Sequence, residues 1–357
     1  MKLTPLLLSL FPLLPATAAV DLIIGEPKTA AVSEPFSVDF DSAGSLYGVE
    51  FTKSNRLFKW KDGKLEFIAG VQHNSEDKKK PLPPLNDGSD PLAAMFNGMH
   101  DIQITSDDRA IIGDSFNHRV RLLNLKSGKV STIAGTGKST FGGDGGPATE
   151  AGFNITMTAS LSPDEARIYI ADIGHHRTRQ IDLKTGIVTT VAGNGKGGLP
   201  TDGGAALDTP MGDTRAVAQA RDGTLYILLR GGNSLVALKD EKLQTVVNAS
   251  GKKGYSGDGG PGRDATMNGP KYVAMDNEGN VLIADAENHC VRRYVVKTGI
   301  IERISGAPPK AGNKIGDTLL TTELRRPHGV RIGPDGKLYI ADTYNNRVLR
   351  ADYPATK

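Results

Sequence analysis

The sequence contains a single cysteine, Cys290, so no disulfide can form within one chain. It also lacks an excess of charge of either sign, because 43 Lys and Arg residues stand against 40 Asp and Glu residues. This balance argues against a nucleic-acid-binding protein, which needs clustered basic charge. No apolar run approaches the roughly 20 residues that cross a bilayer, so we expect no membrane anchor. Glycine is abundant, with 43 of 357 residues, and together with 20 prolines it predicts many turns and few long helices.

The first 19 residues differ from the rest of the chain. Lys2 is followed by an apolar run over residues 6–14 and by small residues over 16–19. This pattern predicts a secretory signal peptide, residues 1–19, removed after about Ala19 and followed by a single domain over residues 20–357. The residue directly after the expected cleavage site is Val20 and not a cysteine, so a lipid anchor is not expected. Export without disulfides favours a bacterial protein, and we expect it to be secreted or periplasmic.

One phrase recurs along the chain. Its clearest copy is LYIADTYNNRVLR, residues 338–350, and five other segments can be aligned with it. Each copy is a short apolar run that ends at an acid, followed by a polar turn and a second strand-like run. The acid position holds Glu50, Asp114, Asp172, Leu229, Asp285 and Asp342, at spacings of 64, 58, 57, 56 and 57 residues. Six copies at a near-constant period predict six structural units that close into one body.

Each unit divides into four short strands. In the last unit, the first strand is residues 327–332, and an Asp-Gly turn at 335–336 leads into the second, residues 338–341. The outermost strand is clear at residues 130–135 and 188–193. The sequence therefore predicts an all-β fold, a six-bladed β-propeller of four-stranded antiparallel blades. The last unit lacks its outer strand, and residues 20–25 have the right pattern, so we expect this N-terminal strand to complete blade six and close the ring.

Polar residues that repeat in every unit are predicted to be structural, because the ring separates the copies from one another. The acids concerned are Asp114, Asp172, Asp285 and Asp342. The arginines five positions later, expected to pair with them, are Arg119, Arg177 and Arg347. The turn histidines His118, His176 and His289 are assigned a structural or surface role. The Gly-Gly-Asp-Gly-Gly phrase between units is also expected to be scaffolding, since no Gly-Lys-Ser/Thr follows it as in a phosphate-binding loop.

The residues that do not repeat are more informative about function. Aligned on their turns, the six inner strands begin with Phe36, His100, Met157, Arg215, Lys271 and His328. The next position holds Ser37, Asp101, Thr158, Ala216, Tyr272 and Gly329. The inner strand of a propeller starts at the axis, so these groups are expected to converge at the mouth of the central channel. The candidate site residues are therefore His100, Asp101, Arg215, Lys271, Tyr272 and His328.

The phrases LYIADxxNxRV and VAGxGxxGxxGDGGPA resemble the repeats of the NHL-repeat propeller family, over essentially all of the chain after residue 19. This resemblance implies a six-bladed propeller. Relatives by fold include an amidoglycolate lyase, gluconolactonase-type propellers and many binding modules. The fold by itself therefore does not define the function.

Two interpretations of the channel mouth remain open, and the first is catalytic. The resemblance to the lyase implies a zinc ion with His100 and His328 as two of its three ligands. The cofactor expected for a catalytic channel is therefore a divalent metal, zinc or calcium. Tyr272 would then supply the phenol. Arg215 would bind the anionic group of the substrate, but it stands in blade four, where the third metal ligand would be expected. Asp101 could then supply an oxygen ligand instead. No set of carboxylate and Asn ligands matches the gluconolactonase-type pattern.

The second interpretation is binding. Arg215 and Lys271 lie in adjacent units and would form a cationic mouth suited to a sugar acid, a peptide carboxylate or a protein that covers the loop face. We predict this role, that of an exported, monomeric recognition module for an unidentified protein or anionic small molecule. A metal-dependent lyase or lactone hydrolase is the alternative, and metal retained by the purified protein would favour it.

Overall fold

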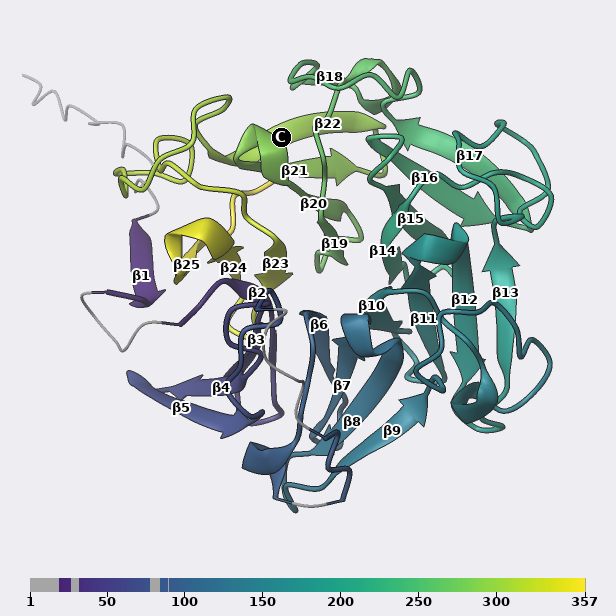
Figure 1. Ribbon diagram of the computed structural model, residues 1–357. Coiled ribbons are helices and arrows are strands. Elements are labelled where there is room, and N and C mark those ends of the chain that lie inside the picture. The colour runs from purple at the N-terminus through teal and green to yellow at the C-terminus, as the bar shows by residue number, and fades with distance from the viewer. Residues whose placement is uncertain (1–18, 27–31, 78–83, 89, 357) are drawn as a thin grey trace, which may run out of the picture.

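A computed structural model describes residues 19–26, 32–77, 84–88 and 90–356, which form six antiparallel sheets around a central axis (Figure 1). The predicted six-bladed β-propeller is confirmed. Residues 1–18 of the expected signal peptide lie outside the described residues. Every helix that the structure describes is a three-residue 3-10 turn, and none has the length or apolar character of a membrane span.

The first four blades run outward from the axis in chain order. Blade 1 contains β2 (Pro35–Phe40), β3 (Leu46–Glu50), β4 (Leu57–Lys61) and β5 (Lys64–Ala69). Blade 2 contains β6 (Met99–Ile104), β7 (Arg109–Asp114), β8 (Arg119–Asn124) and β9 (Val130–Ala134). Blade 3 contains β10 (Thr156–Leu161), β11 (Arg167–Asp172), β12 (Arg177–Asp182) and β13 (Val188–Ala192). Blade 4 contains β14 (Thr214–Gln219), β15 (Leu225–Leu229), β16 (Ser234–Lys239) and β17 (Lys242–Val247).

The last two blades depart slightly from this order. Blade 5 contains β19 (Tyr272–Met275), β20 (Val281–Asp285), β21 (Cys290–Val295) and β22 (Ile300–Gly306), and the short β18 (Gly260–Pro261) adds a fifth strand outside β22. Blade 6 contains β23 (Gly329–Ile332), β24 (Lys337–Asp342), β25 (Arg347–Asp352) and, outermost, β1 (Val20–Ile24). The extra strand arises because the Gly-rich phrase before blade 5 lies along that blade's outer edge.

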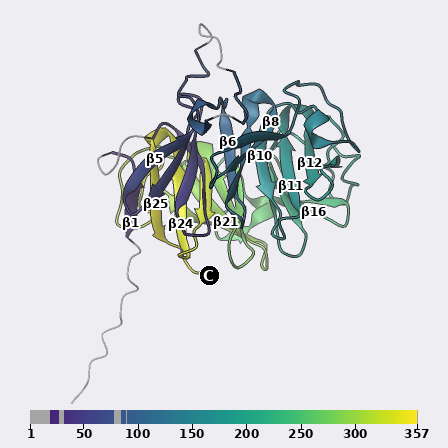
Figure 2. The ribbon, with the colours of Figure 1, turned by 90° about the horizontal axis from the view of Figure 1, so that it is seen from below.

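The ring is closed as predicted by the N-terminal strand. β1 pairs antiparallel with β25, with Val20 opposite Ala351 and Leu22 opposite Leu349 (Figures 1 and 2). Asp21 and Arg350 form an ion pair of 2.9 Å across the two strands. Ile24 is fully buried, and it packs in a cluster that joins blades 6 and 1. The two ends of the described chain are therefore joined within one sheet.

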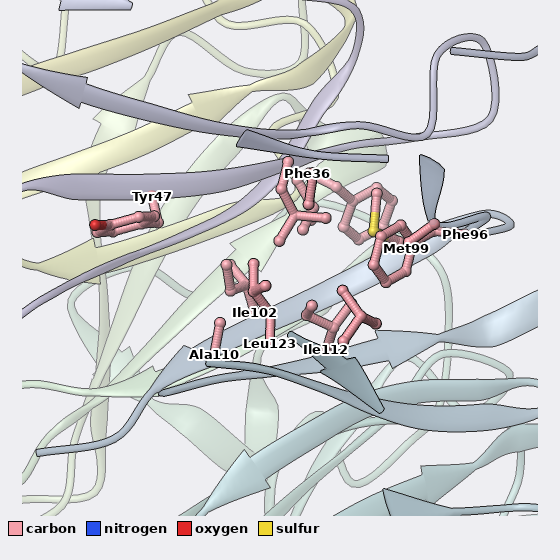
Figure 3. Packing of buried hydrophobic residues seen from close by; sticks show 13 residues of the cluster. Phe36, Tyr47, Phe96, Met99, Ile102, Ala110, Ile112 and Leu123 are labelled. Atoms are coloured by element: carbon pink, nitrogen blue, oxygen red, sulfur yellow. The ribbon is translucent and has the colours of Figure 1, made fainter. Parts of the chain in front are cut away.

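The hydrophobic core is divided into six clusters, and each cluster lies between two neighbouring blades. Figure 3 shows the cluster between blades 1 and 2, where Phe36 and Met99 face Ile102 and Ile112. The second strand of every blade is covered on both faces, which explains its almost continuous apolar sequence. Because each blade buries its surface only against its neighbours, the core depends on the whole ring.

The repeated acids and the Gly-rich phrases are joined by buried arginines. Arg179 is fully buried, and it donates to Asp144 of the preceding Gly-rich phrase at 3.0 Å and lies 3.8 Å from the strand-end Asp172. Arg292 repeats this arrangement in blade 5, with Asp258 at 2.9 Å and Asp285 at 3.5 Å. Each Gly-rich loop is thus held to the blade that follows it by one guanidinium between two carboxylates.

The arginine that contacts the strand-end acid differs from the one expected from the repeat. Only Arg347 of blade 6, five positions after Asp342, pairs with its acid, at 2.7 Å. In blade 2, Arg119 donates to two backbone carbonyls instead, and Arg121 pairs with Asp114 at 3.0 Å. Positions five and seven after the acid share one face of the third strand, so either can reach it. In blade 6 the seventh position after the acid is Leu349, so Arg347 at the fifth position forms the ion pair with Asp342.

A side-chain hydrogen bond, here called a latch, joins every pair of neighbouring blades. The residue after each acid-containing turn is an Asn or a His with positive φ, and it accepts a hydrogen bond from a backbone N–H just before the next inner strand. The Asn latches are Asn55 to Gly98 at 2.6 Å, Asn233 to Gly269 at 2.9 Å and Asn346 to Glu34 at 2.9 Å. The His latches are His118 to Ile155 at 3.0 Å, His176 to Asp213 at 3.4 Å and His289 to Arg326 at 3.1 Å. The repeated turn histidines therefore hold blades together.

The His latches make ring stability sensitive to acid. A backbone N–H can only donate, so Nδ1 of each latch histidine must be unprotonated. Burial lowers the pKa of His118, although the charge of Asp172 opposes it, and burial likewise lowers the pKa of His289 against the charge of Glu287. A histidine whose pKa is lower in the folded chain stabilises the fold above its unfolded value of about 6.5, and this stabilisation is lost as the pH falls.

We therefore expect the double variant His118→Asn/His289→Asn to lose less stability than the parent between pH 7.5 and pH 5. Asn forms the same latch at three other interfaces, so the two proteins should unfold at similar denaturant concentrations at pH 7.5. At pH 5 the variant should be more stable by about 2 kcal/mol, on the order of 1 kcal/mol for each hydrogen bond kept. Equal losses of stability in urea titrations at both pH values would contradict this role for the latches.

Candidate functional site at the channel mouth

The six residues predicted to begin the inner strands lie in contact around the axis, and we call them the floor residues: Phe36, His100, Met157, Arg215, Lys271 and His328. Their exposed fractions are only 2 to 8%. The Phe36 ring stacks on His328 with 4.3 Å between centroids, and its centroid lies 4.6 Å from that of His100. The guanidinium carbon of Arg215 is 5.5 Å from the Phe36 centroid, and Arg215 Nη1 contacts Met157 Sδ. Residues from blades that are far apart in sequence thus meet at one point.

The two histidines of the floor are held neutral. His100 Nδ1 lies 2.7 Å from the carbonyl oxygen of Gly98, so Nδ1 carries the proton and Nε2 keeps its lone pair. Neither ring nitrogen of His328 has a hydrogen-bond partner among the described residues. Burial, followed by the positive charges of Arg215 and Lys271, holds the pKa of both histidines well below the usual value. The floor therefore offers neutral imidazoles beside two basic side chains.

Among the described residues, Arg215 forms no ion pair with a carboxylate, and Lys271 reaches Glu287 only at the limit of ion-pair distance. Arg215 is 4% exposed, and its only hydrogen bond within the described part of the chain is to Met157. Burial and the charge of Arg230 lower the pKa of Arg215 to about 9. Burial and the charge of Arg215 lower the pKa of Lys271 to about 7, and its Nζ lies 4.0 Å from Glu287. Buried charge without a partner is costly, so an anion placed here would restore the missing partner.

Below the floor, a group that we call the plug fills the axis: Ser37, Asp101, Gln103 and Tyr272. Tyr272 donates to Asp101 at 2.7 Å, and Ser37 donates to the same carboxylate oxygen at 3.1 Å. Gln103 donates to the Tyr272 oxygen at 3.1 Å. Burial raises the pKa of Asp101, although the Tyr272 hydrogen bond opposes it, and burial holds the pKa of Tyr272 well above its usual value. Asp101 and Tyr272, both candidate site residues, therefore lie one layer deeper than the other four and bind each other.

Above the floor, residues that directly follow the second strands surround the mouth. We call them the rim residues: Phe51, Phe116, Arg230, Glu287 and Tyr344. Phe51 lies 5.1 Å from Phe36, and Phe116 lies 5.7 Å from His100, measured between ring centroids. Tyr344 lies 5.7 Å from His328. Reasoning from the sequence missed these residues, yet a signal was present, because the two positions after each acid vary within a phrase that otherwise repeats.

An opening of about 440 Å³ lies between blades 4 and 5, beside the rim residues Arg230 and Glu287. It is lined by Asp213, Arg230, Gly231, Asn233, Lys253, Asn268, Gly269 and Glu287. A larger depression of about 720 Å³ lies at the outer edge of blades 3 and 4, and no floor, plug or rim residue lines it. Rim residues line the smaller of these two openings, whereas no floor residue lines either of them.

A metal site would need more ligands than this mouth supplies. Among the described residues, no group of three or more His, Cys, Asp and Glu side chains is placed to hold a metal ion. His100 and His328 both contact Phe36, and Asp101 is engaged by Tyr272 and Ser37. Arg215 occupies the blade-four position from which a further ligand would come. The residues present thus do not fit the three-ligand site implied by the lyase resemblance.

The sequence profile of the NHL repeat matches residues 267–294 and 324–350, which contain the second and third strands of blades 5 and 6. The chain is a six-bladed propeller that carries NHL repeats. Among curated proteins, this NHL propeller is 28% identical over 295 residues to chicken NHL repeat-containing protein 2, covering 74% of this chain and 40% of the relative. The chain thus spans about two fifths of that relative's length.

Solved structures share the fold at low sequence identity. An auxiliary nutrient binding protein from Bacteroides ovatus superposes on the NHL propeller with a TM-score of 0.67 at 14% identity, covering 95% of this chain and 78% of that one. A gluconolactonase from Xanthomonas campestris gives 0.59 at 10% identity, covering 95% and 92%. A binding protein and an enzyme are therefore both built on this fold, and the residues at the mouth must distinguish between the two roles.

Proposed function

We propose that this NHL propeller is a recognition module that binds an anionic ligand at its channel mouth, through Arg215 and Lys271. The observation that carries the proposal is the burial of Arg215 to 4% exposure with no carboxylate partner in the described part of the chain. A carboxylate or phosphate can accept two parallel hydrogen bonds from a guanidinium, and charge-assisted bonds of this kind are strong. Lys271 supplies a second donor on the floor, and the opening between blades 4 and 5 lies beside the rim residues Arg230 and Glu287.

Two further features support a binding role. The B. ovatus fold neighbour is described as an auxiliary nutrient binding protein, and such a role suits a protein outside the cytoplasm. The N-terminal 19 residues have the pattern of a signal peptide, so we also propose export to the periplasm or exterior. An anionic group on a protein partner that covers the mouth face would be recognised by the same cations.

The role of Arg215 can be tested with acetate as a simple anion. We expect acetate to bind the parent protein and Arg215→Gln to bind it at least about tenfold more weakly, since a charge-assisted bond contributes roughly 1.5–3 kcal/mol. In buffer without small anions, Arg215→Gln should melt above the parent, because it removes an unpaired buried charge. Calorimetric titration and thermal melts give both quantities.

The matched control is Arg221→Gln, which changes an exposed arginine at the opposite end of blade 4. It should alter neither acetate affinity nor the melting temperature. Acetate binding that is equal in the parent and Arg215→Gln would remove Arg215 from the site. The alternative, a metal-dependent lyase or lactone hydrolase, requires purified protein with about one divalent metal per chain that is lost in His100→Ala/His328→Ala.

A further inference from the structure

The channel mouth has two chemically different sides. Blades 4 and 5 contribute the basic groups Arg215 and Lys271 to the floor and Arg230 to the rim. Blades 6, 1 and 2 contribute the aromatic rim residues Tyr344, Phe51 and Phe116. A ligand at the mouth would therefore meet basic groups, with Glu287 4.0 Å from Lys271 Nζ, on one side and aromatic rings on the other.

The aromatic side forms a continuous surface. Phe51 lies 4.7 Å from His100 and 6.2 Å from Phe116, measured between ring centroids, and Phe116 keeps 36% of its surface exposed. The Phe116 ring lies directly over Gly98, where a Cβ atom would come within 2.3 Å of the ring. The ring can take this place only because residue 98 has no side chain. One face of the aromatic side is thus placed beside the axis and open to a ligand.

The two sides are close enough for one small molecule to contact both. Phe36 lies between them, with its centroid 5.5 Å from the Arg215 guanidinium carbon and 5.1 Å from the Phe51 centroid. Arg215 and Phe51 are thus both neighbours of Phe36, and a ligand with its carboxylate a few bonds from a ring would place one group near each of them. The aromatic side chains Phe51 and Phe116 cannot accept or donate the hydrogen bonds that the hydroxyl groups of a sugar acid would lose on burial. The geometry therefore disfavours sugar acids and favours ligands with a flat apolar part.

We propose that the ligand of the channel mouth is an aromatic carboxylate. Its carboxylate pairs with Arg215 and Lys271, and its ring packs against Phe51 and Phe116. Stacked and edge-on aromatic pairs contribute on the order of 0.5–1.5 kcal/mol beyond the apolar area that they bury. This inference rests on the proposed function and adds the class of ligand to it. A free aromatic acid and a peptide with a C-terminal aromatic residue present the same chemistry.

The experiment compares four probes by calorimetric titration of the full chain: acetate, gluconate, 3-phenylpropanoate and the peptide Gly-Gly-Phe. We expect 3-phenylpropanoate to bind at least tenfold more tightly than acetate and gluconate. Phe51→Leu and Phe116→Leu should each weaken 3-phenylpropanoate about fivefold and leave acetate unchanged, whereas Arg215→Gln should weaken both. Gly-Gly-Phe binding as tightly as 3-phenylpropanoate would identify a peptide terminus as the source, and weaker binding would identify a free acid.

The controls separate the failure of this inference from that of the proposed function. Phe141→Leu changes an exposed phenylalanine outside the mouth and should alter no affinity. If acetate and 3-phenylpropanoate bind the parent equally, or if gluconate binds most tightly, the proposed preference for an aromatic ligand is wrong. The proposed anion-binding function is then still supported. If none of the four anions binds, both proposals are overturned. Thermal melts of each leucine variant establish that it is folded, because leucine keeps the apolar character of the position.

Discussion

A chain that begins at Glu26 is expected to melt about 10 °C below one that begins at Val20, because it lacks β1. The lost strand buries Ile23 and Ile24, which are 6% and 0% exposed, and it removes the pairing with β25. Burial of an isoleucine stabilises by roughly 1.5–3 kcal/mol, so two isoleucines and the lost pairing amount to about 6 kcal/mol. For a chain of this length, the entropy of unfolding converts that loss into about 10 °C.

The comparison between these two chains isolates β1, since both lack residues 1–19. Calorimetric melting of the two proteins at equal concentration gives the difference directly. A second variant, Ile24→Asn, keeps the strand but places an amide in the cluster between blades 6 and 1, and should lie between the two. If the chain starting at Glu26 has the same melting temperature as the chain starting at Val20, the stability of the ring does not depend on β1.

Arg121→Leu is expected to lower the free energy of unfolding by about 3–5 kcal/mol, the usual cost of breaking a buried ion pair from one side. Arg121 is fully buried, and it donates to Asp114 at 3.0 Å and to the Met95 carbonyl oxygen at 3.0 Å. It also contacts Asp87 of the loop before blade 2. Its loss leaves Asp114 buried among fewer donors, and burial already raises the pKa of that carboxyl.

Two further variants test this explanation in urea titrations. Arg119→Leu removes the neighbouring arginine, whose side chain, within the described residues, donates to the Asn117 and Thr136 carbonyls alone. This variant should cost less than about 1 kcal/mol. Arg121→Leu/Asp114→Asn should recover part of the stability, because no unpaired charge is then buried. The opposite order, with Arg119→Leu the more damaging, would favour the pairing five positions after the acid that the repeat alone had suggested.

Most of the fold could be predicted from the sequence because its signals are local and repeated. The outer strand expected at residues 130–135 is observed as β9 (Val130–Ala134), and the strand expected at 20–25 is observed as β1. Apolar runs, Asp-Gly turns and a near-constant period are sufficient for this, since each unit must cover the next in the same way. Alignment of the repeats also predicted that Arg215, Lys271, His100 and His328 lie close together at the axis.

The sequence could not show how deep each of these side chains lies along the channel axis. Asp101 and Tyr272 follow floor residues by a single position, yet they belong to the plug and bind each other. The rim was missed for a related reason, because Phe51 and Phe116 stand in segments that read as turns. Neither distinction can be drawn from periodicity, since it depends on which way individual side chains point at a strand end.

The plug has a consequence for the exchange of ligand with solvent. Because Asp101, Tyr272, Ser37 and Gln103 close the axis beneath the floor, a molecule bound at the mouth can only leave through the face by which it arrived. Release then requires the loss of its contacts with the floor and the rim on that one face. Competitors and partner proteins that cover this face would slow release as well as block association, while the opposite face of the ring would remain free for unrelated contacts.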